Sequence, residues 1–424
     1  MANKTIFLYD AGMKIWIKLL AGSALGIILG LVSPQDGRLA EILPWLEQFA
    51  LRLGRYALVP MLFFSLAIGV HKLREERRLF STALRAALVS AAVSAAVIAL
   101  GVTATMIVIS SAPGRVPIVA EEQAQAVGFD LAGSALEMFP LNMFQALSSD
   151  GVFLLPIYAM AFFIGLGLSF DKAHGKQMAG LADSLSRLFY HISSFFVEIL
   201  GFLMIALCAY WAIRFRNAAS MAVFNWMMVS LGIIAAAIGL VALPFLLCLL
   251  RPKANPLSAL YGSVAPAIAA FFSGDINFAM PALALHAKES FGAKRRSSAL
   301  VLPMLAAFCR GGSAMVGASA FIVVFHSYSG MGMSVADATS LGLSALLLSF
   351  MLARHPGNGA YVALAALSLG FGRGYEEGYL ILRPIAFYLV AVGAFLDAMI
   401  ASLANYACAR MGAFVEDRSP RQYV

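Results

Sequence analysis

Interrupted apolar stretches constrain the fold of this chain more than any other feature of its sequence. Two of them lie within residues 267–313, where Ser273-Gly274-Asp275 breaks the first and Cys309-Arg310-Gly311-Gly312-Ser313 breaks the second. A third break follows at Arg354-His355-Pro356-Gly357-Asn358-Gly359. In hydrocarbon, freed backbone groups and charges are costly unless protein or a water-lined cavity satisfies them. Interrupted apolar segments in corresponding halves of a membrane protein therefore indicate a binding site near the bilayer midplane.

The composition is that of a helical membrane protein. Of the 424 residues, 61% are hydrophobic and 12% are charged, and the mean hydropathy is +0.84. Many apolar runs reach the roughly 20 residues that a transmembrane helix needs, and the alternation of an outer-membrane barrel is absent. We attribute the net charge of +8 to cytoplasmic loops rather than to nucleic-acid binding. The four cysteines have no metal-ligand spacing and are interpreted as buried apolar residues.

Six membrane spans are expected before the first broken segment, over residues 15–32, 45–70, 86–109, 139–170, 188–213 and 224–250. The basic loops 71–78 and 251–256 are assigned to the cytoplasm, together with the N-terminus. The polar loop 111–138 is then external. The charged connection 171–187 is expected inside the cell.

The broken segments are predicted to form a repeated unit. Residues 257–288 have basic ends on both sides of the turn, so both ends should lie on one membrane side, as in a re-entrant hairpin. A broken seventh span follows over 298–326, a second hairpin over 341–370 and a last span over 380–409, before a charged internal tail. The predicted fold class is therefore an all-α polytopic membrane protein with eight transmembrane helices and two re-entrant helical hairpins, arranged as inverted repeats.

Several short motifs resemble, in their order and spacing, the dicarboxylate/amino acid:cation symporter family, which includes the glutamate transporters. They cover nearly the whole chain: Pro60 with the Phe64–Gly69 that follows, Pro140–Phe144, Arg251–Pro281, Val301–Pro303, Pro356–Gly359 and Phe395–Asp397. The resemblance implies a homotrimer in the cell (inner) membrane that moves a small-molecule substrate by an elevator motion, with both termini cytoplasmic.

The resemblance also implies a division of labour along the chain. Residues 1–256 are expected to form mainly the trimerisation scaffold, although the third and sixth spans should move with the transport domain. Residues 257–412 are expected to form the transport core, made of the hairpins and the last two, broken, helices. The second hairpin would serve as a gate, and residues 413–424 would be a cytoplasmic tail.

Substrate-binding positions follow from the same resemblance. Asp397 fits the family's aspartate that holds the amino group of the substrate, and the hairpin tips and broken helix supply its other neighbours. The expected substrate-binding residues are Ser273, Gly274, Asp275, Asn277, Arg310, Ser313, Arg354, His355, Pro356, Gly357, Asn358, Gly359, Asp397, Ala401 and Asn405.

The sequence departs from the family at the positions that serve the coupled cation. The family's Asn-Met-Asp-Gly-Thr motif is replaced here by Cys309-Arg310-Gly311-Gly312-Ser313, so its Asn and Asp become Cys309 and Gly311. The Asn and final Asp of the last helix fall on Ala404 and Cys408, with Asn405 one position away. Ile400 stands where transporters of acidic substrates carry an arginine.

These departures reverse the local charge. Sodium needs oxygen ligands and compensating negative charge in a low dielectric. We therefore expect Arg310 to act as a built-in positive charge, with Asp275 or Asp397 as its counter-ion. Two alternatives remain open: Arg310 binds the carboxylate of the substrate, or it is a structural arginine. Arg354 and His355 could add positive charge from the gate, and His355 or a buried aspartate could carry a proton.

The sequence predicts a secondary transporter of small carboxylate-bearing solutes, either amino acids or dicarboxylates, whose uptake does not need sodium. No cofactor is expected, and coupling to Na⁺ or H⁺ stays open. The alternatives are a sodium-independent exchanger or uniporter, an anion-conducting channel-like protein and a binding-only sensor. An enzyme is not expected, because no nucleophile–base pair, HExxH motif or phosphate loop is found.

Overall fold

The protein is an assembly of long helices in a computed structural model that describes residues 14–34, 38–111, 133, 136–148, 152–170, 172–219, 222–250, 255–330 and 332–416. Four parts of the chain discussed above lie outside these ranges: the N-terminal residues 1–13, most of the external loop 111–138, residues 251–254 of one basic loop and the tail beyond 416. The first half contains α1 (Ile15–Val32), α2 (Arg38–Arg55), α3 (Leu58–Glu75), α4 (Leu79–Ser111), η1 (Met143–Ser148), α6 (Leu155–Gly167) and α7 (Lys172–Ala219).

The second half alternates short and long helices. It contains η2 (Ala222–Phe224), α8 (Asn225–Ala236), the π-helical η3 (Ala237–Ala242), α9 (Leu243–Leu250), α10 (Pro256–Ser273), α11 (Ile276–Glu289), α12 (Arg295–Phe308), α13 (Gly311–Ser329), α14 (Val335–Ser349), η4 (Leu352–Arg354), α15 (Gly359–Phe371), η5 (Gly378–Ile385) and α16 (Ala386–Met411). The pairs α10–α11 and α14–α15 pack on each other as helical hairpins.

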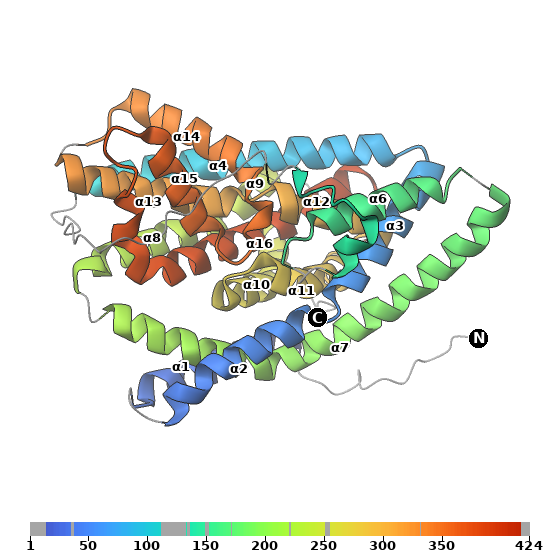
Figure 1. The fold of residues 1–424 in the computed structure, drawn as a ribbon, viewed down its shortest axis with the longest axis horizontal. Helices are drawn as coiled ribbons and strands as arrows, with labels where there is room; N and C mark the ends of the chain where they lie inside the picture. Colours follow the sequence, from blue (N-terminus) through green and yellow to red (C-terminus); the bar gives the residue numbers. More distant parts are fainter. Residues whose placement is uncertain are drawn as a thin grey trace.

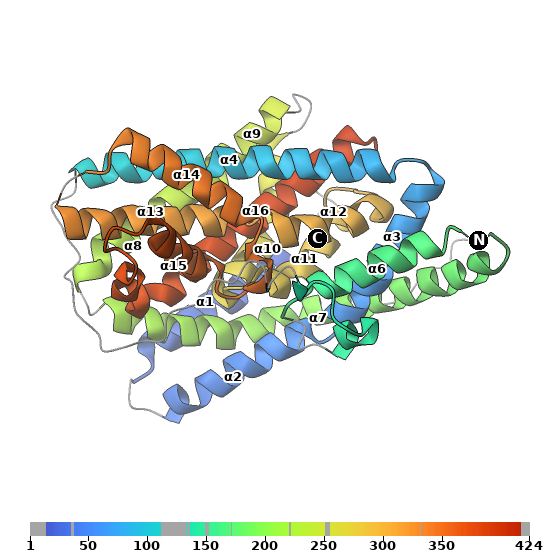
Figure 2. The same ribbon diagram turned by 45° about the horizontal axis from the view of Figure 1, so that its top comes forward.

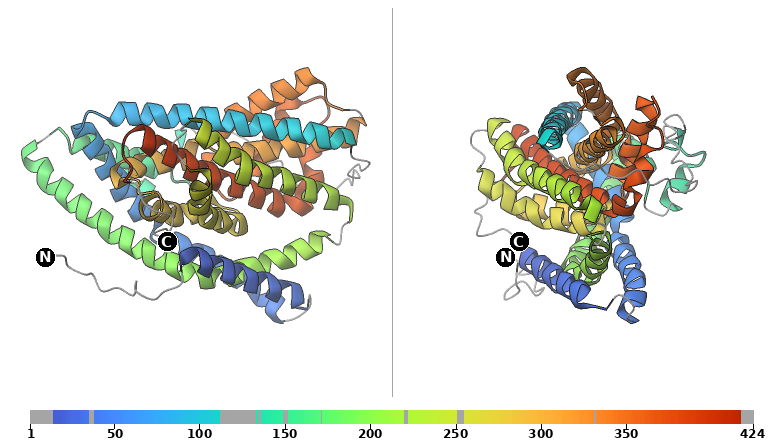
Figure 3. Two further views of the ribbon diagram at one scale, coloured as in Figure 1. Left: turned by 180° about the vertical axis from the view of Figure 1, so that it is seen from behind. Right: turned by 90° about the vertical axis from the view of Figure 1, so that its left-hand side faces the viewer.

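The helices form two groups along the long axis of the molecule. Figures 1 and 2 show α1, α2 and α7 along one side and α4 along the opposite side, with α13, α15 and α16 between them. The end-on view of Figure 3 also separates the dark-blue α1 and α2 from the orange α13 and α14. Helix α7 packs on α1, α2 and α3, whereas α13 packs on α4, α15 and α16. The groups are not independent, because α3 also packs on α12 and the buried apolar residues of both belong to one continuous cluster.

Membrane embedding follows from the lengths and composition of the helices. Eight segments among the described residues are long and apolar enough to cross a membrane: α1, α2 with α3, α4, α7, α8 to α9, α10, α12 with α13, and η5 with α16. The last two segments are the most buried of the eight. Other helices of the protein therefore surround most of the length of these two segments.

Several helix predictions are confirmed. The first span over residues 15–32 matches α1, and the turn at Ser273-Gly274-Asp275 separates α10 from α11. Gly274 has φ +67° there, a left-handed conformation that glycine adopts without steric cost. The second hairpin turns between α14 and α15, as predicted for Arg354–Gly359.

Other helix predictions are wrong, each for a local reason. The second span is two helices, because Pro60 cannot donate to the carbonyl of Tyr56, and the chain restarts as α3 at Leu58. The fourth apolar region is not a single span but consists of η1 and the short α6. Pro156 lies in the first turn of α6. The connection 171–187 is helical from Lys172, and α16 continues unbroken through Asp397. A charged surface thus does not end a helix that has good helix-forming residues.

Candidate functional site

The break between α12 and α13 places the side chain of Arg310 inside the protein. Helical geometry ends at Phe308 and resumes at Gly311, so the predicted break is confirmed and is confined to Cys309 and Arg310. The backbone N–H of Arg310 donates to the carbonyl of Ser349, at the end of α14, over 3.3 Å. The Arg310 side chain is only 1% exposed. A charge so deeply buried requires a partner.

That partner is Asp397, in the middle of α16. Arg310 Nε donates to Asp397 Oδ2 at 2.7 Å, and Asp397 is 0% exposed. Ser313 Oγ donates to the same oxygen at 2.5 Å, and the backbone N–H of Ser313 donates to Oδ1 at 3.0 Å. The carboxylate therefore lies at the N-terminal end of α13, where backbone dipoles also favour negative charge. Both of its oxygens are hydrogen-bonded.

Two glycines allow α13 to begin in this crowded position. A Cβ atom at Gly311 would lie 2.8 Å from Cα of Ser94 on α4. A Cβ atom at Gly312 would lie 2.7 Å from the backbone nitrogen of Asp397 on α16. These spaces are too small for a methyl group, so the first turn of α13 contacts both helices through its backbone.

We expect Gly312→Ala to lower the free energy of unfolding by about 1–3 kcal/mol, the usual cost of overpacking a core. The Asp397 nitrogen that the added methyl group would meet is backbone and cannot move away freely. Thermal unfolding of the purified protein in mild detergent measures the effect. Gly342→Ala is the matched control, because nothing lies within 4 Å of its added Cβ in α14. Equal unfolding midpoints for the two variants would contradict the tight contact.

The tip of the second hairpin contacts the same guanidinium. Arg310 Nη2 donates to the carbonyl of Pro356 at 3.0 Å. Gly359 lies so close that a Cβ atom there would be 2.8 Å from Arg310 Nη2 and 2.9 Å from Ser313 Oγ. Arg310 thus joins three elements: the broken helix, α16 and the hairpin tip. Of the hairpin-tip residues expected to bind the substrate, Pro356 and Gly359 lie beside Arg310, whereas Gly357 and Asn358 are exposed.

Asp275, the other predicted counter-ion of Arg310, has a different partner. It is 0% exposed and forms an ion pair with Arg55 on α2. Asp275 Oδ1 also accepts a hydrogen bond from the backbone N–H of Asn277 at 2.8 Å and thereby caps α11. Asn277 Nδ2 donates to the carbonyl of Val152 at 3.1 Å, away from Arg310. Of the two aspartates expected as counter-ions of Arg310, the one that pairs with it is therefore Asp397.

Arg354 and His355 do not join the Arg310 cluster through hydrogen bonds of their side chains. Arg354 Nη1 forms an ion pair with Glu137 Oε2 at 2.9 Å and is 37% exposed, so it faces outward. His355 is half-buried, and its Nδ1 has no hydrogen-bond partner among the described residues. The prediction that Arg354 supplies positive charge to the site from the gate finds no contact in this conformation.

The predicted cation positions fall into two sets, one at the break between α12 and α13 and one on α16. None of these positions carries a carboxylate. The Cys309 thiol lies 3.4 Å from Ser94 Oγ and donates to the carbonyl of Ser90 at 3.6 Å. Farther along α16, the cation positions Ala404 and Cys408 are buried, as are Ala401 and Asn405, which were expected to bind the substrate. Asn405 Nδ2 donates to Ser298 Oγ on α12 at 3.3 Å, about 12 Å beyond Asp397 along the helix axis. Asn405 therefore belongs to the packing of α12 on α16.

A cavity of about 300 Å³ lies where the two hairpin tips approach α2, α7 and α16. Ser273 and Gly274 line it from the first hairpin, and Gly357 and Asn358 line it from the second. Its charged lining residues are Arg55 and Glu47 on α2 and Arg214 on α7. A volume of this order suits a small organic solute, because ligand pockets usually begin at about 300 Å³.

Arg55, Glu47 and Arg214 were not predicted as site residues from the sequence. One signal was present: Arg214 fits poorly in an external loop at the end of a span. In the structure its guanidinium lies 4.6 Å from the ring centre of Phe387, another residue that lines the cavity. Arg55 carried no such signal, because its partner Asp275 lies far away in the sequence.

Comparison with known protein families adds one finding to this geometry. The model of the family described as "Sodium:dicarboxylate symporter family" matches residues 15–417. The match spans all helices from α1 to α16 and every site residue described above. A search among curated proteins finds no match.

Proposed function

The chain belongs to the sodium:dicarboxylate symporter family, and within that family we propose that it carries dicarboxylates without requiring sodium. Family membership makes the protein a secondary transporter of carboxylate-bearing solutes in a membrane, and a family of transporters fits the prediction that the chain is not an enzyme. The observation that carries the proposal is the buried pair of Arg310 and Asp397.

Sodium independence rests on the charge that already fills the break in the seventh span. Arg310 is a permanent cation, and it contacts Asp397 and the Pro356 carbonyl, two oxygen groups that a bound cation would also favour. A second positive charge beside the guanidinium would be repelled in a medium of low dielectric. The residues at the family's cation positions, Cys309 and Gly311, supply no compensating carboxylate.

Preference for dicarboxylates over amino acids rests on the occupancy of Asp397. Arg310 and Ser313 donate three hydrogen bonds to its two oxygens, and the guanidinium beside the carboxylate would repel the ammonium group of an amino acid. The cavity at the hairpin tips instead offers the guanidinium of Arg214, which suits a carboxylate, and that of Arg55, which also pairs with Asp275. We propose that the solute enters there, beside Ser273, Gly274, Gly357 and Asn358.

The proposal extends to the mechanism and the assembly. Helix α4 packs on α13, α14 and α16, which supports a transport core that carries the third span with it in an elevator motion. Family membership supports a homotrimer with re-entrant hairpins in the cell membrane, and the basic loop 71–78 supports cytoplasmic termini. The lining of the cavity by both hairpin tips supports a gating role for the second hairpin.

Uptake into proteoliposomes tests the proposal. Dicarboxylates, acidic amino acids and neutral amino acids would each be offered with an inward sodium gradient, an inward proton gradient or neither. We expect saturable dicarboxylate uptake that is equal with and without sodium, and the proton arm will reveal any proton coupling. Arg214→Gln should raise the KM by about tenfold, the effect of losing one charged hydrogen bond, whereas Arg52→Gln, exposed on α2, should not.

Each other outcome of this experiment would contradict one part of the proposal or favour one alternative function. Sodium-driven uptake would contradict the role of Arg310 as a built-in cation. Uptake of amino acids alone would contradict the assignment of Asp397. An anion current without saturable uptake would favour a channel-like protein, and ligand binding without flux would favour a sensor.

A further inference from the structure

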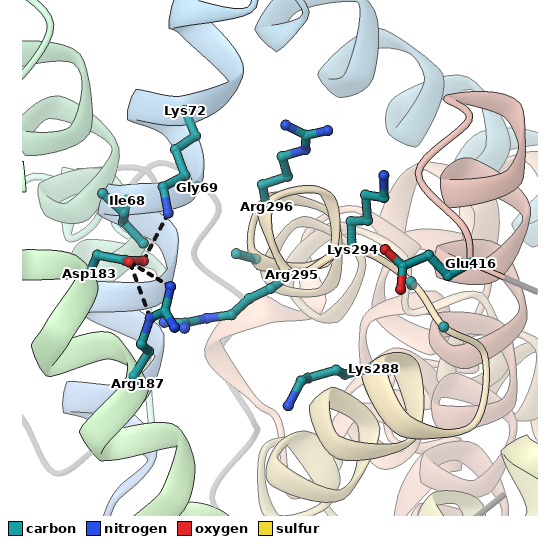
Figure 4. Close-up of a pocket in the computed structure, with 13 residues that line it drawn as sticks. Ile68, Gly69, Lys72, Asp183, Arg187, Lys288, Lys294, Arg295, Arg296 and Glu416 are labelled. Carbon is teal, nitrogen blue, oxygen red and sulfur yellow. Dashed lines mark hydrogen bonds and ion pairs between the residues drawn. The ribbon is translucent and has the colours of Figure 1, made fainter. Parts of the chain in front are cut away.

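A second cavity lies at the other end of the seventh span and contains an unusual concentration of positive charge. Its volume is about 500 Å³, and α3 and α7 line one side while α11, α12 and Glu416 line the other. Figure 4 shows the space between these two walls, with side chains directed into it from both. Six basic residues line the cavity: Lys72, Arg187, Lys288, Lys294, Arg295 and Arg296. Two acidic residues, Asp183 and Glu416, accompany them.

The carboxylates near this cavity are too few to neutralise its cations. Asp183 is shared, since Lys72 Nζ lies 2.9 Å from Oδ1 and Arg187 Nη2 lies 3.1 Å from Oδ2. Arg296 pairs with Glu76, and Lys288 pairs with Glu289 at 2.7 Å.

In the described part of the chain, Lys294 and Arg295 have no carboxylate of their own, and the carboxylate that attracts Arg295 is Asp183, which Lys72 and Arg187 already share. Arg295 Nη2 donates to the hydroxyl of Ser186, a neutral partner on α7. Among the residues that the structure describes, no carboxylate forms an ion pair with Lys294 or Arg295. Figure 4 shows Arg295 extending from α12 towards Arg187, so two guanidinium groups approach each other across the cavity. Like charges at close range are unfavourable unless an anion lies between them.

The backbone at this cavity is fixed and adds to the positive potential. Helix α12 begins at Arg295 without a side-chain cap, so the positive end of its dipole faces the same region. The preceding turn is held by the segment that follows α16, because Lys294 N–H donates to the carbonyl of Phe414 at 2.7 Å and Glu416 N–H donates to that of Gly292 at 2.9 Å. The basic residues are therefore presented by a preformed site.

We propose that this cavity binds a phosphate-bearing anion. Several cations that converge from two walls match a tetrahedral group with more than one negative charge better than a single carboxylate. The phosphate would come from an anionic phospholipid headgroup or from a soluble phosphate compound. The cavity is separate from the Arg310 site, because the α12 helix of 14 residues puts about 21 Å between its two ends.

Binding here would also hold the two helix groups together. Lys72 and Arg187 belong to α3 and α7, whereas Lys294 and Arg295 belong to the segment that leads into the broken helix. A phosphate that contacts both walls is bound only while the walls face each other. If the core moves relative to the scaffold, as in the proposed function, the ligand favours the present conformation. Binding itself does not depend on that motion.

Binding to the purified full-length protein in neutral detergent tests the inference without any transport assay. Pyrophosphate would be titrated at constant ionic strength while the thermal unfolding midpoint is measured. In parallel, nanodiscs of phosphatidylcholine would be compared with nanodiscs that contain phosphatidylglycerol. We expect one of these phosphate sources to raise the midpoint. Lys294→Gln combined with Arg295→Gln should weaken the apparent affinity by about tenfold or more, because two charged contacts are lost.

A charge-matched control separates the site from general attraction of anions. Arg77→Gln combined with Lys176→Gln removes two exposed basic residues of α3–α4 and α7 that do not line this cavity, and it should leave the affinity unchanged. Lys294→Gln alone, which removes no ion pair among the described residues, covers the case that the double variant misfolds. A response to pyrophosphate assigns a soluble ligand, and a response to phosphatidylglycerol alone assigns a lipid. No response, or an equal loss in both double variants, would overturn the inference.

Discussion

Arg310→Met should lower the free energy of unfolding by about 3–5 kcal/mol and abolish uptake, because it leaves the Asp397 carboxylate buried without a cation. Asp397 is 0% exposed, and Ser313 alone would remain as its partner. The loss of the contact between Arg310 and the Pro356 carbonyl would also release the tip of the second hairpin. Thermal unfolding in detergent and uptake into proteoliposomes measure the two effects.

Three further variants test whether the buried charge pair is the cause of these effects. Asp397→Asn should be similarly destabilising, since it leaves the guanidinium buried without its counter-ion, and Arg310→Met with Asp397→Leu should regain stability but not uptake. Arg354→Met removes an arginine from the same hairpin, where the exposed pair with Glu137 contributes at most about 1 kcal/mol. If Arg310→Met changed only the KM and kept full stability, Arg310 would be a substrate ligand rather than a structural cation.

The sequence was sufficient to locate the breaks but not all of their partners. Ser273-Gly274-Asp275 and Cys309–Ser313 interrupt apolar runs with residues that favour turns or demand polar partners, so the breaks follow from local chemistry. Which aspartate pairs with Arg310 does not follow from local chemistry, because the pairing depends on how α16 and α2 approach the broken helix. Arg55 lies on a helix early in the chain, and no local pattern connects it with Asp275.

The sequence also did not determine the exact position of one residue along its helix or the boundaries of two helices. Asn405 lies one position from the family's asparagine, and the structure pairs it with Ser298 on α12, a contact between distant parts of the chain. The helical start of α7 was missed because its charged residues resemble a loop, although they lie on the surface of a continuous helix. The short α6 was overestimated because apolar composition alone does not fix a helix boundary.

Removing the ion pair of Arg55 and Asp275 should also lower stability, and it probes the contact between the two helix groups. Asp275 is 0% exposed, whereas Arg55 is 23% exposed and keeps access to solvent. We therefore expect Arg55→Met to lower the free energy of unfolding by about 1–3 kcal/mol, less than for the fully buried pair. Arg52→Met, exposed on the same helix, should change it little.

The same pair should bias the conformational equilibrium, since it joins α2 of the first group to the first hairpin of the second. If the core moves along the scaffold, the pair stabilises only the present arrangement, and its loss should change the conformational equilibrium constant against that arrangement about 5- to 150-fold for 1–3 kcal/mol. Asp275→Asn should rescue Arg55→Met in part, because the neutral side chain can still cap α11 through Asn277. Thermal unfolding of the two single variants and the double variant gives the coupling energy. Strictly additive effects would mean that the pair does not hold the two groups together.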